Sequence, residues 1–292
     1  MGEKLAALTN QTRGDRWVKA AAAAWLVAVC LALVGCRDPR PLTPARQLNA
    51  EQLLALPTPE HEHCYALIFS SQRPSHEPRY THTWGTAVRT IELPGQPRRI
   101  IAVDTISWMP ATLEIVPGRL TPEKGVNLGL DATIQEMLKQ QERVSLWGPY
   151  EIWRGLYLRF IEQKGFIESG RIGYQCIDQI GGAARNANAS NCFHAITDMD
   201  PQFGRGEYPL IRYGDDASEN IVRQLFRRPL LINPRHTHDW LIKALGLDRY
   251  PITFRRYSGP AREFSPEAMR AEAEAYMPAS QPASAPASAN SK

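Results

Sequence analysis

The sequence has little excess charge of either sign. Lys and Arg total 34 and Asp and Glu total 30, so the formal net charge is +4. Four basic and two acidic residues precede Cys36, which leaves a net charge of +2 for the rest of the chain. A surface that binds nucleic acid is usually strongly basic, so this balance argues against a nucleic-acid partner.

A long apolar run is also missing. Residues 20–35 are apolar and uncharged, but they fall short of the roughly 20 residues that a membrane-spanning helix prefers. Four basic residues precede this run. A positive segment followed by a short apolar one predicts a signal peptide over residues 1–35.

The apolar run ends in Leu33-Val34-Gly35-Cys36, which resembles the lipobox of bacterial lipoproteins. The resemblance implies that everything before Cys36 is removed and that Cys36 is diacylated, and more than one acyl chain anchors a protein stably. An uncleaved anchor helix that happens to end in Cys is the alternative. Both interpretations place the rest of the chain in the cell envelope, facing away from the cytoplasm.

Cysteine is scarce, with five residues in 292. Cys30 lies in the predicted signal peptide and Cys36 is the predicted lipidation site. The odd number that remains, Cys64, Cys176 and Cys192, leaves at least one thiol unpaired within the chain, and such a thiol can be a reactive one. A Cys64–Cys176 disulfide is compatible with the sequence, which supplies no geometry to test it.

The chain shows no internal repeat and divides by composition. Residues 36–60 are rich in Pro and polar residues and are interpreted as a lipidated tether. Residues 61–260 form the predicted domain, and residues 261–277 a terminal helix with an N-cap at Ser265. Residues 278–292 are mostly Pro, Ala and Ser with no bulky apolar residue, which predicts a disordered tail.

The predicted domain has strand patterns early, helical spacing in the middle and further strands later. Strands are expected at residues 65–69, 83–91, 99–108, 173–177 and 252–257, and helices at residues 131–142, 150–164, 191–199, 221–226 and 240–245. The first three strands follow one another closely, which predicts an antiparallel meander. The whole pattern predicts an α+β domain.

Cys192 is the strongest candidate for a nucleophile. Ser190 or Asn191 is placed to cap the helix that follows, so Cys192 lies in its first turn. Free backbone N–H groups and the positive end of the helix dipole favour a thiolate there and, with Asn191 in support, can donate to an oxyanion. His194 is poorly placed to be the base, because residues two apart on a helix point in opposite directions.

His82 is the better candidate for the base. It lies at the start of a predicted strand, where a ring can be held rigidly, and a third group must orient that ring. Asp104 lies on the neighbouring predicted strand and could reach His82 across the ladder, with Ser107 as a substitute.

The order of these residues resembles the circularly permuted papain-like hydrolases, which include bacterial cell-wall amidases and peptidases and the lecithin retinol acyltransferase-like enzymes. Asn191-Cys192-Phe193-His194 is similar to the Asn-Cys-Glu-His stretch of the acyltransferase-like branch, and Thr81-His82-Thr83 to a Gly-His-Thr stretch of some lipoproteins. The similarity spans residues 65–199 and implies an antiparallel sheet packed on helices. The segment between His82 and Cys192 is longer than the family pattern, and the strand around His82 has fewer aromatic residues.

The resulting hypothesis is an envelope thiol hydrolase or acyltransferase that acts on an amide or ester bond. Cys192 attacks the carbonyl, His82 moves the proton and Asp104 holds the ring, and the chemistry needs no cofactor. Cell-wall peptide and lipid are the nearest substrates. The alternative is a non-catalytic envelope lipoprotein that uses the same fold as a binding or scaffolding module.

Two histidine pairs offer a different kind of site. His61 and His63 are two residues apart, as are His236 and His238. On an extended segment both members of a pair point to one side, so the two pairs could complete a tetrahedral zinc site if the segments met. Nothing in the sequence brings them together, and no metal site is predicted.

Overall fold

The computed structural model describes residues 52, 55, 58–75, 77–178, 188–200, 213–228, 230–257 and 261–262. The predicted signal peptide, the lipidation site at Cys36, most of the tether, the terminal helix and the tail lie outside the described residues. No helix in the described part of the chain combines the length and apolar character needed to cross a membrane.

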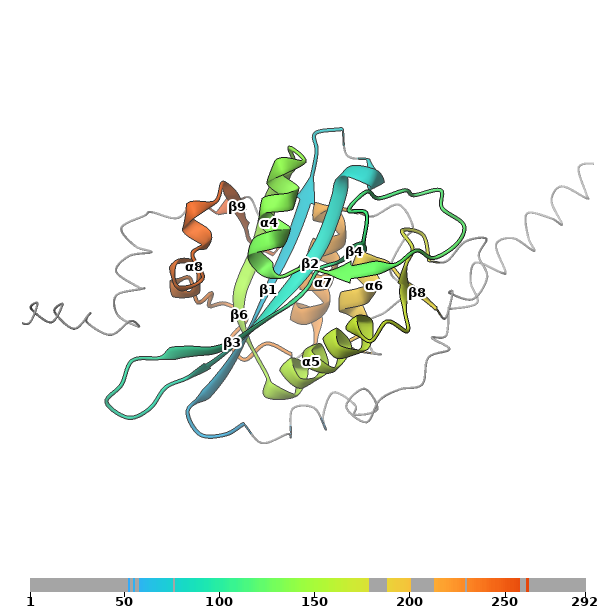
Figure 1. The fold of residues 1–292 in the computed structure, drawn as a ribbon. Coiled ribbons are helices and arrows are strands. Elements are labelled where there is room, and N and C mark those ends of the chain that lie inside the picture. Colours follow the sequence, from blue (N-terminus) through green and yellow to red (C-terminus); the bar gives the residue numbers. More distant parts are fainter. Residues whose placement is uncertain are drawn as a thin grey trace, which may run out of the picture.

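The described residues form an α+β fold around a six-stranded sheet, as predicted for the class (Figure 1). The strand order is β10-β9-β6-β1-β2-β3. The strands are β1 (Glu62–Gln72), β2 (Thr81–Ile91), β3 (Arg99–Ile106), β6 (Arg143–Ile152), β9 (Ile252–Arg255) and β10 (Ala261–Arg262). The first three form the predicted antiparallel meander, and β9 is parallel to β6.

Five α-helices and two small ribbons surround the sheet in the described residues. The helices are α4 (Leu130–Lys139), α5 (Arg154–Glu168), α6 (Cys192–Thr197), α7 (Asp215–Arg227) and α8 (Trp240–Ala244), with 3-10 turns η1 (Pro78–Tyr80) and η4 (Leu247–Arg249). The ribbons pair β4 (Trp108–Pro110) with β5 (Gly125–Asn127), antiparallel, and β7 (Gly173–Tyr174) with β8 (Ala189–Ser190), parallel.

Strand alternation gives the sheet two distinct faces. On the face of Trp84, the Trp84 ring stacks on Phe69 with centroids 5.1 Å apart. A Cβ atom at Gly85 would lie on the opposite face, 3.4 Å from Phe160 of α5 and 3.8 Å from Ile196 of α6. We refer to these surfaces as the Trp84 face and the Gly85 face.

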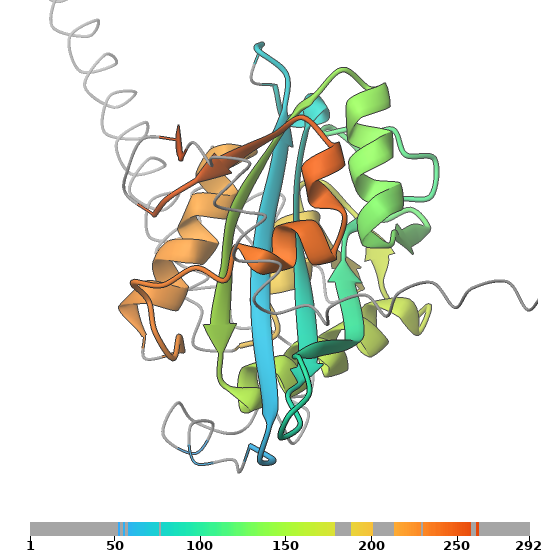
Figure 2. The same ribbon diagram turned by 90° about the vertical axis from the view of Figure 1, so that its left-hand side faces the viewer.

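Helices cover both faces of the sheet. On the Trp84 face, Tyr65 of β1 packs edge-on against Trp240 of α8, with ring centroids 6.1 Å apart. Figure 2 shows α8 in front of β1, and α4 beside it. On the Gly85 face, α7 joins α5 and α6, and Ser218 of α7 donates a hydrogen bond to Thr83 of β2 at 3.1 Å.

Strand β6 is the main departure from the predicted elements. Residues 150–152 end this strand, so the helix predicted from residue 150 begins at Arg154, and it continues through Gly165 rather than ending there. Pro149 is tolerated inside the strand because the pairing with β1 shifts register between Ala66 and Ile68. Gly148 has φ +94°, and a Cβ there would lie 2.8 Å from the Ala66 carbonyl oxygen, so only glycine fits.

The other elements follow the predictions with shifted ends. Helices α6 and α8 lie within the predicted ranges, and α4 begins one residue before its predicted range and ends three residues short of it. Helix α7 begins at Asp215 rather than at residue 221, and β7 ends at Tyr174 rather than at residue 177.

A buried ion pair joins α5 to the segment after α6. Arg159 Nη1 lies 3.0 Å from Asp200 Oδ1, and both side chains are almost completely buried. Because solvent is excluded from both charges, each depends on the other. The pair therefore fixes the end of the α6 segment against α5 on the Gly85 face.

Candidate functional site

Cys192 is the first residue of α6, as predicted. Asn191 is the N-cap, and its Oδ1 accepts a hydrogen bond from the backbone N–H of His194 at 2.8 Å. The Cys192 thiol lies beside the backbone of Thr83 in β2. The ladder between β2 and β3 begins at Gly85, so the thiol borders a part of β2 that β3 does not cover.

His82 is held by one hydrogen bond and one ring contact. Its Nε2 lies 2.9 Å from Ser107 Oγ, and the ring stacks on Trp84 with centroids 5.4 Å apart. The backbone N–H of Ser107 donates to Asn127 Oδ1 at 2.7 Å, which fixes the position of Ser107. The second ring nitrogen, Nδ1, is buried and has no hydrogen-bond partner in the described part of the chain.

Burial decides the charge of His82. The side chain is 1% exposed, and removal from water lowers the pKa of His82 to about 3. The imidazole is therefore neutral near pH 7. If Nε2–H donates to Ser107 Oγ, Nδ1 presents its lone pair, which is the form that a general base needs.

Asp104 does not reach His82. It pairs with Ala87 in the β2–β3 ladder, on the Gly85 face, and its carboxylate accepts a hydrogen bond from Tyr157 Oη at 3.2 Å. His82 shares the Trp84 face. Alternation along the strand separates the two side chains, so the predicted orienting role of Asp104 passes to its substitute, Ser107.

Cys192 and His82 are neighbours without a direct contact. The His82 ring lies on the Trp84 face, whereas α6, which carries Cys192, packs on the Gly85 face, and the thiol borders the backbone of Thr83. No hydrogen bond between Cys192 Sγ and the ring is present among the described residues. The structure thus brings together Cys192, Asn191, His82 and Ser107 around one end of β2, but it does not join Cys192 to its predicted base.

The thiol of Cys192 is protonated at rest. Burial raises the pKa of Cys192 to about 11, and the nearby backbone N–H groups of Thr83 and Phe193 oppose this shift only in part. The lowered pKa expected for a thiol in the first turn of a helix is therefore contradicted. The helix is only six residues long, and the cost of a buried charge outweighs its dipole.

Asp178 organises the start of α6. Its carboxylate accepts hydrogen bonds from Asn191 Nδ2 at 3.2 Å and His194 Nδ1 at 2.7 Å. His194 is thereby directed to Asp178 and away from the role of base, as the helical geometry predicts. The charge of Asp178 also contributes to the raised pKa of Cys192.

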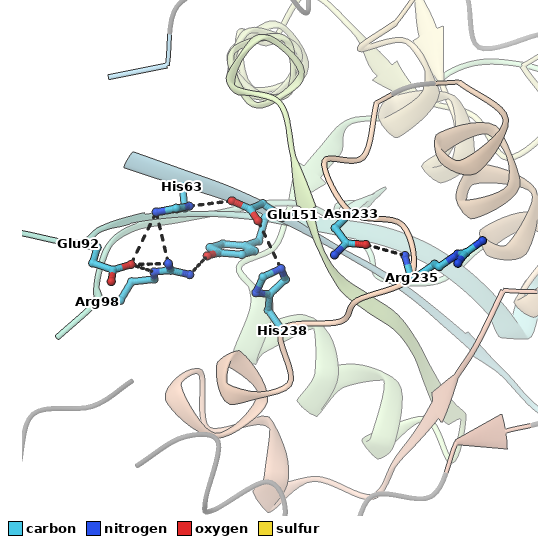
Figure 3. A network of polar contacts seen from close by, with 8 residues as sticks. His63, Glu92, Arg98, Glu151, Asn233, Arg235 and His238 are labelled. Carbon is cyan, nitrogen blue, oxygen red and sulfur yellow. Dashed lines mark hydrogen bonds and ion pairs between the residues drawn. The ribbon is translucent and has the colours of Figure 1, made fainter. Parts of the chain in front are cut away.

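A second polar cluster lies at the other end of β1, and it was not predicted (Figure 3). His63 Nδ1 lies 2.7 Å from Glu151 Oε1, and His238 Nε2 lies 3.5 Å from Glu151 Oε2. One histidine from each of the two pairs thus meets the Glu151 carboxylate. In the described residues, however, no group of three His, Cys, Asp or Glu side chains is arranged to hold a metal ion.

Arg98 connects this cluster to the protein surface. It pairs with Glu92, donates to Tyr65 Oη at 2.6 Å and lies 3.4 Å from His63 Nε2. Beside it lies a cavity of about 390 Å³ lined by Gln96, Pro97, Arg98, Arg99, Ile100, Trp240 and Ala244. The paired histidines are the only sequence pattern that pointed to this cluster.

Protonation in the cluster follows burial and charge. Burial lowers the pKa of His238 to about 4, against the opposing effect of Glu151. Burial raises the pKa of Glu151, but the hydrogen bond from His63 and the proximity of His238 outweigh it and place that pKa below its usual value. Near neutral pH the cluster therefore contains an ionised carboxylate next to a neutral His238.

No protein-family model, no curated protein and no solved structure matched the chain.

Proposed function

We propose that the protein is a thiol hydrolase or acyltransferase that acts on an amide or ester bond, with a permuted papain-like arrangement of Cys192, His82 and Ser107. One observation supports it above the others. The His82 ring is held at Nε2 by Ser107, and its buried Nδ1 is left without a partner one residue from the Thr83 backbone that borders Cys192. Thiol activation needs a base whose ring is held by a hydrogen bond at one nitrogen and whose other nitrogen has no hydrogen-bond partner.

The proposed reaction starts from two neutral groups. His82 Nδ1 accepts the proton of Cys192 Sγ as the sulfur attacks the substrate carbonyl. The backbone N–H groups at the start of α6, which lie beside the sulfur, donate to the developing oxyanion. The imidazolium then protonates the leaving group, and a thioester remains on Cys192 until water or an acceptor alcohol or amine takes the acyl group.

The reaction requires Sγ, which comes from the Gly85 face, and Nδ1, which lies on the Trp84 face, to meet at the edge of β2 that β3 does not cover. Catalytic hydrogen bonds are often long or poorly aligned in a free enzyme and tighten only in the complex with substrate. In the proposal, substrate binding brings the two groups together, and the resting pKa values keep the thiol protonated until then. The proposed mechanism uses no cofactor.

The decisive experiment uses the full chain and a chromogenic ester such as p-nitrophenyl butyrate. We expect a thioester adduct on Cys192, detected by peptide mass spectrometry after acid quenching. Cys192→Ala should abolish it, and His82→Gln should slow its formation by about 10²–10⁴-fold. Cys64→Ser is the matched control and should react normally. An adduct that survives Cys192→Ala, or a rate unchanged in folded His82→Gln, would rule out the dyad.

The cellular setting belongs to the same proposal. A lipid on Cys36 would anchor the domain to a membrane in the cell envelope, facing away from the cytoplasm, with cell-wall peptide or lipid as the nearest substrate. Cys36→Ser should abolish labelling by a radioactive fatty acid and leave the precursor unprocessed, as seen by gel mobility. Labelling that persists in this variant would refute the anchor.

A non-catalytic binding or scaffolding module is the second candidate. The raised pKa of Cys192 and the missing contact with His82 favour it. The same ester experiment separates the candidates, because a module of this kind forms no adduct that depends on both Cys192 and His82.

A further inference from the structure

We propose that Cys176 and Cys192 form a reversible disulfide. Such a bond would block the Cys192 sulfur. Its regulatory consequence rests on the proposed function, but the bond itself does not. The starting observation is the parallel pairing of β7 with β8, in which Gly173 is paired with Ala189 and Tyr174 with Ser190.

The two segments stay side by side beyond these strands. The backbone N–H of Gln175 donates to the Ser190 carbonyl at 3.2 Å. Farther along, Asp178 accepts a hydrogen bond from His194 at 2.7 Å. In both strand pairs and in the Asp178–His194 contact, the two residues are 16 positions apart in the sequence. Cys176 and Cys192 are also 16 positions apart, which places them opposite each other. Contacts before and after the two cysteines therefore bracket them.

The expected separation suits a disulfide. Tyr174 and Ser190, each two residues before a cysteine, are strand partners, and neighbouring strands lie about 4.8 Å apart. Disulfides join Cα atoms roughly 4.4–6.8 Å apart, a range that the cysteines can reach if the two segments stay as close as the flanking contacts indicate. The charge of Cys192 also affects the titration of Cys176, which requires the two sulfurs to be close. Both residues keep part of their surface exposed to solvent.

Cys64 is too distant to compete. Cys192 borders Thr83, which pairs with Ser70 of β1. Cys64 lies six residues before Ser70 on the same strand, a distance of roughly 20 Å at about 3.3 Å per residue. The Cys64–Cys176 disulfide that the sequence left open is therefore replaced by a Cys176–Cys192 pair.

The chemistry balances with a disulfide oxidant such as oxidised glutathione. One thiol loses its proton and attacks a glutathione sulfur, which forms a mixed disulfide and releases one glutathione. The second cysteine, also deprotonated, attacks the protein sulfur of the mixed disulfide and releases the other. Two protons and two electrons leave the protein, and two reduced glutathione molecules form. Because burial raises the pKa of both thiols, the reaction should be faster at alkaline pH.

The test uses the reduced full chain, incubated with oxidised glutathione and digested without reduction. We expect one cross-linked peptide pair that contains Cys176 and Cys192 and that dithiothreitol separates. Cys64→Ser should give the same pair. Cys176→Ser should give none, and its Cys192 should stay free or bind one glutathione. A disulfide that contains Cys64 would overturn the proposal. So would the absence of a Cys176–Cys192 link in folded wild-type protein after incubation with oxidised glutathione.

The ester assay distinguishes a failure of the disulfide proposal from a failure of the proposed function. If the disulfide forms and the reduced protein makes no thioester, the bond stands and the enzyme proposal fails. If the reduced protein makes a thioester and oxidised glutathione yields no internal link, the enzyme proposal stands and the disulfide fails. When both are correct, oxidation should lower thioester formation at least tenfold and dithiothreitol should restore it.

Discussion

Arg159→Met should lower the free energy of unfolding by about 3–5 kcal/mol. The substitution breaks the ion pair with Asp200, whose side chain is 2% exposed and cannot replace the lost interaction with water. A buried charge without its counter-ion is among the most destabilising changes a single substitution makes. Urea denaturation followed by circular dichroism would measure the change.

Two variants control for the loss of the arginine itself. Arg249→Met removes an arginine that pairs with Asp131 on the surface, and it should leave stability almost unchanged because water screens that pair. The double variant Arg159→Met/Asp200→Leu should be more stable than Arg159→Met, since no buried charge remains. Equal stability of Arg159→Met and the wild type would show that the pair does not hold the fold.

Acid should destabilise the protein well before most carboxylates are protonated. The pKa of His82 is about 3 in the folded protein and about 6.5 in an unfolded chain. Below pH 6.5 the unfolded state therefore binds a proton at His82 and the folded state does not. The free energy of unfolding falls as the pH drops from about 6.5 towards 3. The loss amounts to roughly 4 kcal/mol for His82, and His238, with its pKa of about 4, adds to it.

The contribution of His82 can be isolated by substitution. His82→Gln has no proton to gain, so its stability should depend less on pH between about 6.5 and 4 than that of the wild type. His61→Gln, at a half-buried position outside this site, is the matched control. Glu142, whose pKa burial raises, acts in the opposite direction in both proteins. Identical slopes for wild type and His82→Gln would contradict the assignment.

Local patterns predicted the antiparallel meander because its strands are continuous and β-rich. Strand β6 was not predicted, and the reason is physical. Gly148 and Pro149 interrupt its sequence, and only the register shift opposite Ala66 and Ile68 makes them compatible with a strand. The shift depends on a partner about 80 residues away in sequence, so no local pattern reveals it.

The sequence predicted which residues form the candidate site better than it predicted their arrangement. The cap at Asn191 and the position of Cys192 follow from local rules, and both are confirmed. The choice between Asp104 and Ser107 depended on which face of the sheet each residue occupies, and that is set by the pairing register. The protonated state of Cys192 depends on burial by distant segments, which the sequence does not show.

The position of β1 has a consequence for the growing chain. This strand lies in the middle of the sheet, yet among the described strands it is the first to leave the ribosome. One of its edges stays unpaired until β6 has been made, with Cys64 opposite Ile152. Until then a nascent chain displays an unpaired edge beside Leu67, Ile68 and Phe69. Such an edge is a template for wrong pairing with other chains. The protein should therefore depend on a holding chaperone during the synthesis of roughly 80 residues, the interval between its first and fourth long strands.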